Sequence, residues 1–272
     1  MKKIWDCEVI DMKYGFIGCG NMGGAIARAL SKTTTDIQLA DRSGKGKLLA
    51  QELGITYSDN QTIASTCERI FLGVKPHLMR GMLLPLQAVL SERKPLLITM
   101  AAGLTIAQIE EFAGCKLPVI RIMPNTPVTV GKGMTQYCCN ALVTEEVLES
   151  FLQDMAPSGK LDMLDESLID AASALSGSGP AYMYIFLEAL ADGAVACGIP
   201  RQKAMEYAAA TMIGAAETFL ATGCHPGALK DAVCSPGGST IEGLRALEQH
   251  GFRAAAMDCV AATYRKNKEL GK

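Results

Sequence analysis

The chain has 272 residues, of which 49% are hydrophobic and 20% are charged, with a formal net charge of −2. This length and composition are typical of a globular protein with one large domain or two smaller ones. The small net charge and the scattered Lys and Arg residues give no electrostatic reason to expect nucleic acid or an anionic membrane as a partner.

Residues 1–12 contain charged side chains and no apolar segment of the kind found in signal peptides. We interpret them as an extension before the first strand, with Met12 as an alternative start. From there to about residue 165, short β-rich runs alternate with helical runs. Predicted strands cover residues 14–18, 37–40, 70–74, 96–100, 119–123, 134–138 and 160–164, and predicted helices cover 22–30, 45–53 and 105–112. This alternation predicts a mostly parallel sheet with helices on both faces.

After residue 165 the pattern becomes helical only. Long Ala-rich helices are predicted over residues 181–197, 201–221, 239–249 and 253–270, separated by Gly- and Pro-containing breaks. The first two are apolar around their whole circumference, so they must be buried. We expect them to pack against a second copy of the chain, which predicts a homodimer, with a higher oligomer of such dimers as an extension. The alternative is a tight bundle within one chain.

Ten cysteines are present, isolated along the chain except for adjacent Cys138 and Cys139. They form no C-x-x-C pair and accompany no secretion signal, which favours reduced thiols in a soluble, cytoplasmic protein. The three histidines have no second ligand at zinc spacing, so we expect no metal.

A glycine-rich turn follows the first predicted strand and precedes the first helix. It reads Gly18-Cys19-Gly20-Asn21-Met22-Gly23, the G-x-G-x-x-G pattern in the context that dinucleotide binding requires. The first Gly permits the tight turn, the second lets the main chain approach a pyrophosphate, and the third allows close helix–strand packing. The fold class is therefore predicted as α/β, with a Rossmann dinucleotide-binding domain over residues 13–165 and an all-helical dimerisation and substrate-binding domain over residues 166–272.

The residues after the second strand bear on the choice of cofactor. Asp41 stands where an acid holds the adenosine ribose of NAD. It is followed by Arg42, Ser43, Lys45 and Lys47, which suit a 2′-phosphate. We therefore favour NADP(H), with NAD(H) also accepted; the alternative is a solvated turn in which the basic residues are idle.

Four further segments carry a family resemblance. They are Val74-Lys75-Pro76, Met123-Pro124-Asn125-Thr126-Pro127, Leu175-Ser176-Gly177-Ser178-Gly179-Pro180 and Ser235-Pro236-Gly237-Gly238-Ser239-Thr240. In sequence and order they resemble the signature segments of the pyrroline-5-carboxylate reductase family, and the resemblance covers nearly the whole chain except the first dozen residues. It implies that the cofactor is also bound by Asn60 on its adenosine half and by Val74, Lys75, Pro76, Met123 and Asn125 around the nicotinamide.

The last segment can also be interpreted physically. Ser239 and Glu242 have the spacing of a capping box, and the glycines before them bring bare main-chain N–H groups to a helix N-terminus, which is an anion site. The alternative is a well-capped helix without a ligand. With the resemblance, we assign the substrate carboxylate to Ser235, Gly237, Gly238, Ser239 and Thr240.

The resemblance implies reduction of 1-pyrroline-5-carboxylate to L-proline by hydride transfer from NAD(P)H, with the active site between the Rossmann domain of one subunit and helices of another. Thr240 is the predicted hydrogen-bond donor to the imine nitrogen, and Lys75 is the second catalytic candidate. Family members often carry an acid before the His225-Pro226 turn, where this chain has Gly223 and Cys224, so no acid–base role is assigned there.

Three alternatives remain beside this prediction. A reductase of another cyclic imine differs only in pocket size. A β-hydroxyacid dehydrogenase is disfavoured because the chain contains no K-x-x-N motif. A non-catalytic dinucleotide-binding protein is disfavoured because Lys75, Asn125 and the Gly237–Thr240 loop are all present.

Overall fold

The computed structural model describes residues 14–270, so the predicted N-terminal extension and Cys7 lie outside the described residues. The chain divides into two compact units. Unit 1 runs to Gly177 and also takes the segment from Tyr264 onward, whereas unit 2 is Ser178–Thr263. The dinucleotide fingerprint belongs to unit 1 and the Ser235–Thr240 segment to unit 2.

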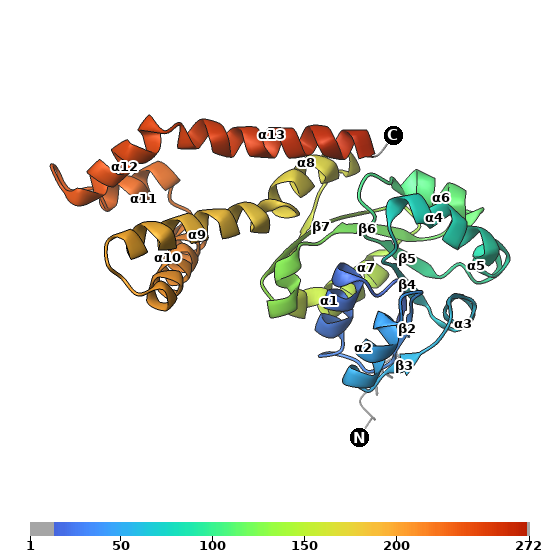
Figure 1. Ribbon diagram of the computed structural model, residues 1–272. Helices are drawn as coiled ribbons and strands as arrows, with labels where there is room; N and C mark the ends of the chain where they lie inside the picture. Colours follow the sequence, from blue (N-terminus) through green and yellow to red (C-terminus); the bar gives the residue numbers. More distant parts are fainter. Residues whose placement is uncertain (1–13, 271–272) are drawn as a thin grey trace, which may run out of the picture. The chain divides into compact units, whose positions relative to one another are not determined.

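Unit 1 is built on one sheet of eight strands in the order β3-β2-β1-β4-β5-β6-β7-β8 (Figure 1). The strands are β1 Tyr14–Ile17, β2 Ile37–Ala40, β3 Thr56–Tyr57, β4 Arg69–Leu72, β5 Leu96–Thr99, β6 Val119–Met123, β7 Gly133–Cys139 and β8 Gly159–Met163. The first six are parallel, β7 runs antiparallel to β6, and β8 is parallel to β7. The predicted Rossmann arrangement is confirmed.

Helices cover both faces of this sheet. They are α1 Asn21–Leu30, α2 Lys45–Leu53, α3 Asn60–Thr66, α4 Pro76–Leu83, α5 Gln87–Arg93, α6 Ile106–Ala113, α7 Glu145–Met155 and α8 Glu166–Ser176, with short 3₁₀ turns at Leu84–Leu86, Thr126–Val130 and Ala156–Ser158. Side chains of α3 to α6 and α8 pack in one buried cluster, and those of α1, α2 and α7 pack in the other. Strands β1, β4, β5 and β6 are buried throughout because helices cover them on both sides.

Two buried arginines tie helices to the sheet. Arg69 on β4 donates to Ser150 at 2.9 Å and to Asp154 at 3.1 Å, both on α7. Arg121 on β6 pairs with Asp170 and Glu166 of α8. Each guanidinium is 1% exposed, and a charge so deeply buried is tolerated only when it is paired. These contacts therefore fix where α7 and α8 lie on the sheet.

Unit 2 is helical, as predicted. It consists of α9 Gly179–Ala196, α10 Arg201–Thr222, α11 Pro226–Ala232, α12 Ser239–Gln249 and the first part of α13 Phe252–Leu270. In this single chain α9 and α10 bury only Ala191, Ala204 and Ala208. Among the described residues, no helix combines the length and apolar character needed to cross a bilayer.

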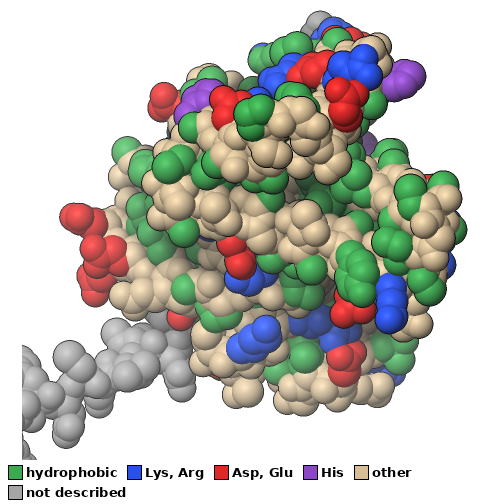
Figure 2. Space-filling view, turned by 90° about the vertical axis from the view of Figure 1, so that its left-hand side faces the viewer, with side chains coloured by type: hydrophobic (Ala, Val, Ile, Leu, Met, Phe, Trp, Pro, Cys, Tyr) green, Lys and Arg blue, Asp and Glu red, His purple; other side chains and the backbone are tan. Residues whose placement is uncertain are grey.

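The exposed side chains of α9 and α10 are unusually large and apolar. They include Met183, Tyr184, Ile185, Leu190, Met205, Tyr207, Ile213, Phe219 and Leu220, which are 38–72% exposed. Figure 2 faces the side on which α9 to α12 are drawn in Figure 1, and hydrophobic side chains in green recur across much of it. Apolar surface of this extent is typical of an interface.

Candidate dinucleotide and carboxylate sites

The turn after β1 brings three glycines into main-chain contact. Gly18 has φ of +100°, which favours glycine. A Cβ on Gly23 would lie 2.2 Å from the carbonyl oxygen of Gly18, and a Cβ on Gly73 would lie equally close to that oxygen. Gly20 differs, because a Cβ there meets nothing within 4 Å. The main chain of Gly20 therefore faces open space, as the approach of a pyrophosphate requires.

Helix α1 starts directly at this turn without a side-chain cap. Gly20 is its N-cap residue and makes no side-chain hydrogen bond, and the first main-chain bond of the helix runs from Gly24 to Gly20 at 2.8 Å. The N–H groups of Asn21, Met22 and Gly23 are thus left at a helix N-terminus, where the dipole favours an anion. The three residues belong to the predicted site through their main chain.

A cavity of about 560 Å³ opens beside this turn at the carboxyl ends of the central strands. It brings together nine of the residues predicted for the cofactor site: Gly18, Cys19, Gly20, Asp41, Arg42, Ser43, Asn60, Val74 and Lys75. This edge is where doubly wound sheets bind ligands. Pro76, Met123 and Asn125 do not line the cavity, although Pro76 is the first residue of α4, which does.

The loop between β2 and α2 determines the charge at one end of the cavity. Oδ2 of Asp41 accepts hydrogen bonds from the main-chain N–H and the hydroxyl of Ser43, while Oδ1 lies against Gly46, where a Cβ would come within 3.0 Å. Partial burial raises the pKa of Asp41, but the hydrogen bonds from Ser43 and neighbouring main-chain groups outweigh it, so the net shift is downward. The carboxylate is therefore ionised and engaged by its own loop.

The basic side chains of the same loop are differently placed. Arg42 and Lys45 are exposed, and neither makes an ion pair within residues 14–270. Helix α2 begins at Lys45, whose main-chain N–H donates to the Ser43 hydroxyl at 3.4 Å. Two exposed cations without an ion-pair partner in this range suit a phosphate group.

One wall of the cavity was not predicted. It is formed by α4 and the turn after it, through His77, Leu78, Gly81, Met82 and Pro85. The sequence does contain a pattern that indicates this wall. Pro76 favours the start of a helix, and His77, Gly81 and Pro85, spaced by four residues, would lie on one face of it. A Cβ on Gly81 would meet nothing within 4 Å, so this position opens on to free space.

Cys19 lies inside the fingerprint but is not placed for chemistry. Its side chain is 4% exposed and Sγ lies 3.7 Å from the carbonyl of Ala40. Burial, helped by the negative charge of Asp41, raises the pKa of this thiol to about 12. Because the thiolate is the reactive form, Cys19 serves packing at neutral pH.

The predicted carboxylate segment forms a turn that leads into α12 in unit 2. The N–H of Gly238 donates to the carbonyl of Ser235 at 3.0 Å, with Pro236 and Gly237 between them. Gly237 has φ of +67°, the left-handed value that glycine adopts without strain in such a turn. Ser239 and Thr240 are exposed at the first two positions of the helix.

The predicted capping box at Ser239 was wrong. The N-cap residue is Gly238, which has no side chain to cap the helix, and Glu242 pairs with Arg245 instead. The extended conformation of Gly238 moves the helix start one residue earlier than the S-x-x-E pattern indicates. The consequence favours an anion, because the N–H groups of the first turn have no side-chain partner.

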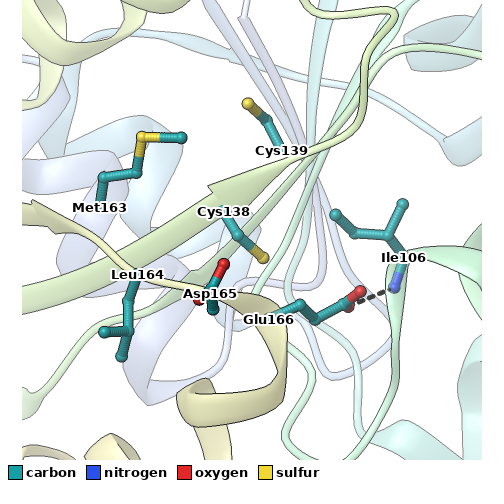
Figure 3. Close-up of a pocket in the computed structure, with 7 residues that line it drawn as sticks. All are labelled: Ile106, Cys138, Cys139, Met163, Leu164, Asp165 and Glu166. Carbon is teal, nitrogen blue, oxygen red and sulfur yellow. Dashed lines mark hydrogen bonds between the residues drawn. The ribbon is translucent and has the colours of Figure 1, made fainter.

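A second cavity, of about 520 Å³, lies near the ends of β7 and β8 (Figure 3). It is lined by Ile106, Cys138, Cys139, Met163, Leu164, Asp165 and Glu166. Glu166 accepts from the main-chain N–H of Ile106 at 2.7 Å, and burial raises the pKa of Cys138 to about 12. Within residues 14–270, no three His, Cys, Asp or Glu side chains are grouped so as to hold a metal. Glu166 in this cavity connects α8 to the start of α6 and to Arg121 on β6.

Comparison with known proteins covers both units. Residues 166–270 match the family model described as pyrroline-5-carboxylate reductase dimerisation, and residues 13–103 match the one described as NADP oxidoreductase coenzyme F420-dependent. Pyrroline-5-carboxylate reductase of Escherichia coli (strain K12) is 39% identical over 269 residues, which cover 97% of this chain and 100% of that protein. The protein of the same name from Pisum sativum is 39% identical over 94% of this chain and 95% of its own length.

A solved structure is similar over almost the same extent. The crystal structure of Plasmodium falciparum pyrroline carboxylate reductase with NADP bound has a TM-score of 0.87 and 32% sequence identity. The similarity covers 96% of this chain and 99% of that one.

Proposed function

The chain belongs to the pyrroline-5-carboxylate reductase family, and we propose on that basis that it reduces 1-pyrroline-5-carboxylate to L-proline with NAD(P)H, the last step of proline biosynthesis. The observation that carries the proposal is similarity along the full length, with both the dinucleotide turn and the Ser235–Thr240 segment retained. The chain is thus an oxidoreductase acting on a C=N bond.

The residues present fit NADP(H). The glycine turn offers open main chain and an uncapped helix N-terminus for the pyrophosphate. Arg42 and Ser43 line the cavity, and Lys45 follows them in the same loop, where we place the 2′-phosphate. Asp41 is engaged by Ser43, which leaves it less free to hold the ribose hydroxyls of NAD. NADP(H) is therefore the preferred cofactor, with NAD(H) accepted. When bound, it supplies the hydride.

The protein's part in the reaction is to position the reactants and supply a hydrogen bond. The uncapped start of α12, with Ser235, Gly237, Gly238 and Ser239, holds the substrate carboxylate. The Thr240 hydroxyl donates to the imine nitrogen or relays a proton from water, since it is too weak an acid to ionise. Lys75 is the second candidate, acting by charge or through an ordered water, from the N-cap of α4.

The remaining cofactor contacts follow the family pattern. Asn60 lies at the adenosine half, and Val74, Lys75, Pro76, Met123 and Asn125 border the nicotinamide. We propose that residues 13–165 form the domain that binds the cofactor. Residues 166–272 form the domain that binds the substrate and makes the dimer.

The assembly proposed is a homodimer formed through the C-terminal helices, with higher oligomers built from such dimers. The matched dimerisation model and the exposed apolar side chains of α9 and α10 support it. We place the protein in the cytoplasm, where exposed thiols such as Cys197 and Cys224 stay reduced. The partner is a small-molecule substrate, with no role for nucleic acid or a membrane.

The test is to mix the purified protein with pyrroline-5-carboxylate and to follow first NADPH and then NADH at the nicotinamide absorbance band. Rapid oxidation is expected, with a higher kcat/KM for NADPH. Cofactor binding without oxidation would contradict the proposal and favour another cyclic imine as substrate, or a non-catalytic binding protein.

A further inference from the structure

Asn125 uses both ends of its side-chain amide inside unit 1. It is 7% exposed and follows β6 by two residues. Its Oδ1 accepts a hydrogen bond from the main-chain N–H of Met134 on β7 at 2.9 Å, and its Nδ2 donates to the carbonyl of Ser176 at 2.9 Å. Ser176 is the last residue of α8, and its carbonyl belongs to the helix end, where partners within the helix are missing.

A second buried amide holds the same serine. The hydroxyl of Ser176 donates to Oε1 of Gln136 at 2.8 Å, and Gln136 is 5% exposed. Gln136 is in turn the cross-strand neighbour of Met123 in the antiparallel pair of β6 and β7. The end of α8 is thus tied to both strands from which the Met123–Asn125 loop projects.

The amide of Asn125 has only one orientation that satisfies these partners. Exchanging its oxygen and nitrogen would set two acceptors against each other at Ser176 and two donors at Met134. Asn125 is also the N-cap residue of the 3₁₀ turn Thr126–Val130, yet its side chain makes no capping bond there. The Asn125 amide is therefore needed for its contacts with Met134 and Ser176 and not for the 3₁₀ turn that follows it.

We infer that Asn125 is a positioning residue, which sets the main chain of the Met123–Asn125 loop against α8 and does not hold the cofactor with its amide. This rests on the proposed function, which puts the loop beside the nicotinamide. Both ends of the Asn125 amide are engaged within unit 1, and the residue does not line the dinucleotide cavity, so we expect cofactor affinity not to depend on this amide. Hydride transfer does depend on the loop, because a shift of about 1 Å can lower turnover about 100-fold.

Asn140 offers a matched control. At the opposite end of β6, its amide accepts from the main-chain N–H of Val119 at 3.2 Å and donates to the carbonyl of Leu117 at 2.9 Å. It also donates to the carboxylate of Glu110 at 3.1 Å. Asn140→Ala should lower the melting temperature at least as much as Asn125→Ala, because it also removes a hydrogen bond to a carboxylate. Only Asn125→Ala should lower kcat, by about tenfold or more. Neither should change the Kd for NADPH measured by fluorescence titration.

Asn125→Asp tests the hydrogen bonds and covers the case in which the alanine variant fails to fold. A protonated carboxyl has one donor and one acceptor, so it can meet both partners, whereas a carboxylate repels the Ser176 carbonyl. The ratio of variant to wild-type kcat should therefore rise as the pH falls from about 8 to about 5, with an apparent pKa above the usual range of Asp.

The kcat ratio largely removes the effect of native charges, because both proteins carry them; Asp162 on β8, the cross-strand neighbour of Gln136, is one such charge. On β6 and α8, the charged Arg121, Glu166 and Asp170 are paired with one another. On β7, burial raises the pKa values of Tyr137, Cys138 and Cys139, so these groups are uncharged in that range. The introduced carboxyl is then the group that titrates at this position.

Three results would overturn the inference: an unchanged kcat in Asn125→Ala, a weaker Kd for NADPH in that variant with Asn140→Ala unaffected, or a ratio for Asn125→Asp that does not vary with pH. Wild-type protein without turnover would instead refute the proposed function. Because wild-type turnover is measured first, the two failures are distinguishable.

Discussion

The guanidinium of Arg121 on β6 donates to the carboxylate of Asp170 on α8 across 2.6 Å, and the arginine is 1% exposed. The same guanidinium reaches Glu166 at 3.4 Å, and the carbonyl of Asp170 accepts from Asn267 at 3.2 Å. A helix that carries the chain out of unit 1 is therefore held by a charge that lies in the sheet layer.

Asp170→Asn should lower the free energy of unfolding by about 1 to 3 kcal/mol, because it weakens a hydrogen-bonded partner of a buried charge. Glu248→Gln is the control, since the pair of Glu248 with Arg253 is exposed and is worth at most about 1 kcal/mol. Urea unfolding measures both. Equal losses would contradict the importance given to the buried pair.

Thr240→Ala should lower kcat by about tenfold or more, because it removes the proposed donor to the imine nitrogen. Steady-state kinetics with pyrroline-5-carboxylate measures it. Thr218→Ala is the control, since the Thr218 hydroxyl donates only to the carbonyl of Gly214 within α10. A normal kcat in Thr240→Ala would remove this hydroxyl from the mechanism.

Arg42→Ala should raise the KM for NADPH by about tenfold and leave that for NADH nearly unchanged, because a charged hydrogen bond to a phosphate is worth about 1.5 to 3 kcal/mol. Lys32→Ala removes a charge from the loop after α1, outside the cavity, and should change neither constant. An equal effect of Arg42→Ala on both cofactors would argue against a 2′-phosphate contact.

Gly81→Leu should weaken cofactor binding, because the new side chain would project from α4 into space that lines the cavity. Gly81→Ala is the graded control. Its single methyl group fills little space, and it should raise helix stability by up to about 1 kcal/mol. Binding of NADPH by Gly81→Leu with wild-type affinity would show that the cofactor does not approach this wall.

The Cys19 thiol predicts a loss of stability at high pH. Its pKa in the folded protein is about 12, well above that of an exposed thiol. Below about pH 8.5 both states are protonated. Above it the unfolded chain ionises first, so the free energy of unfolding falls by at most about 1.4 kcal/mol per pH unit until the folded pKa is passed.

Cys19→Ala should remove that contribution, so its free energy of unfolding should fall less steeply than that of the wild type between about pH 9 and pH 10. Unfolding curves at several pH values measure the slope. Cys224→Ala, which changes an exposed thiol, should keep the wild-type slope. Identical slopes for Cys19→Ala and the wild type would contradict the shift.

Seven of the eight strands and the long helices of unit 2 could be predicted from the sequence. The predicted bounds of β2, β6, α2 and α12 agree with the structure, and the bounds of the other predicted strands and helices lie within two residues of the observed ones. Helices α3, α4, α5, α7, α8 and α11 and the two-residue strand β3 were not predicted. Strand β3 and the seven-residue helices α3, α5 and α11 contain too few residues to show a period. That reason does not apply to α7 and α8, which have 11 residues each.

Some features of the candidate site could be predicted from the sequence and others could not. The glycine turn and the Asp41–Ser43 loop are contiguous in sequence and directly follow strands, so their place at the cavity could be predicted. The partners of Asn125 could not, because Ser176 lies 51 residues further along the chain and the contact exists only after α8 has packed. Nor could the start of α12 at Gly238, which depends on main-chain angles that the capping pattern does not encode.

The reversal at β7 has a consequence for where the chain leaves unit 1. Because β7 and β8 run opposite to β6, the end of β8 lies at the edge of the sheet opposite the dinucleotide cavity. Helix α8 is the return path: its 11 residues span about 16 Å, close to the length of a five-residue strand such as β6. It starts beside Arg121 and ends beside Asn125. A helix as long as one strand therefore returns the chain to the carboxyl-end edge of the parallel strands before unit 2 begins.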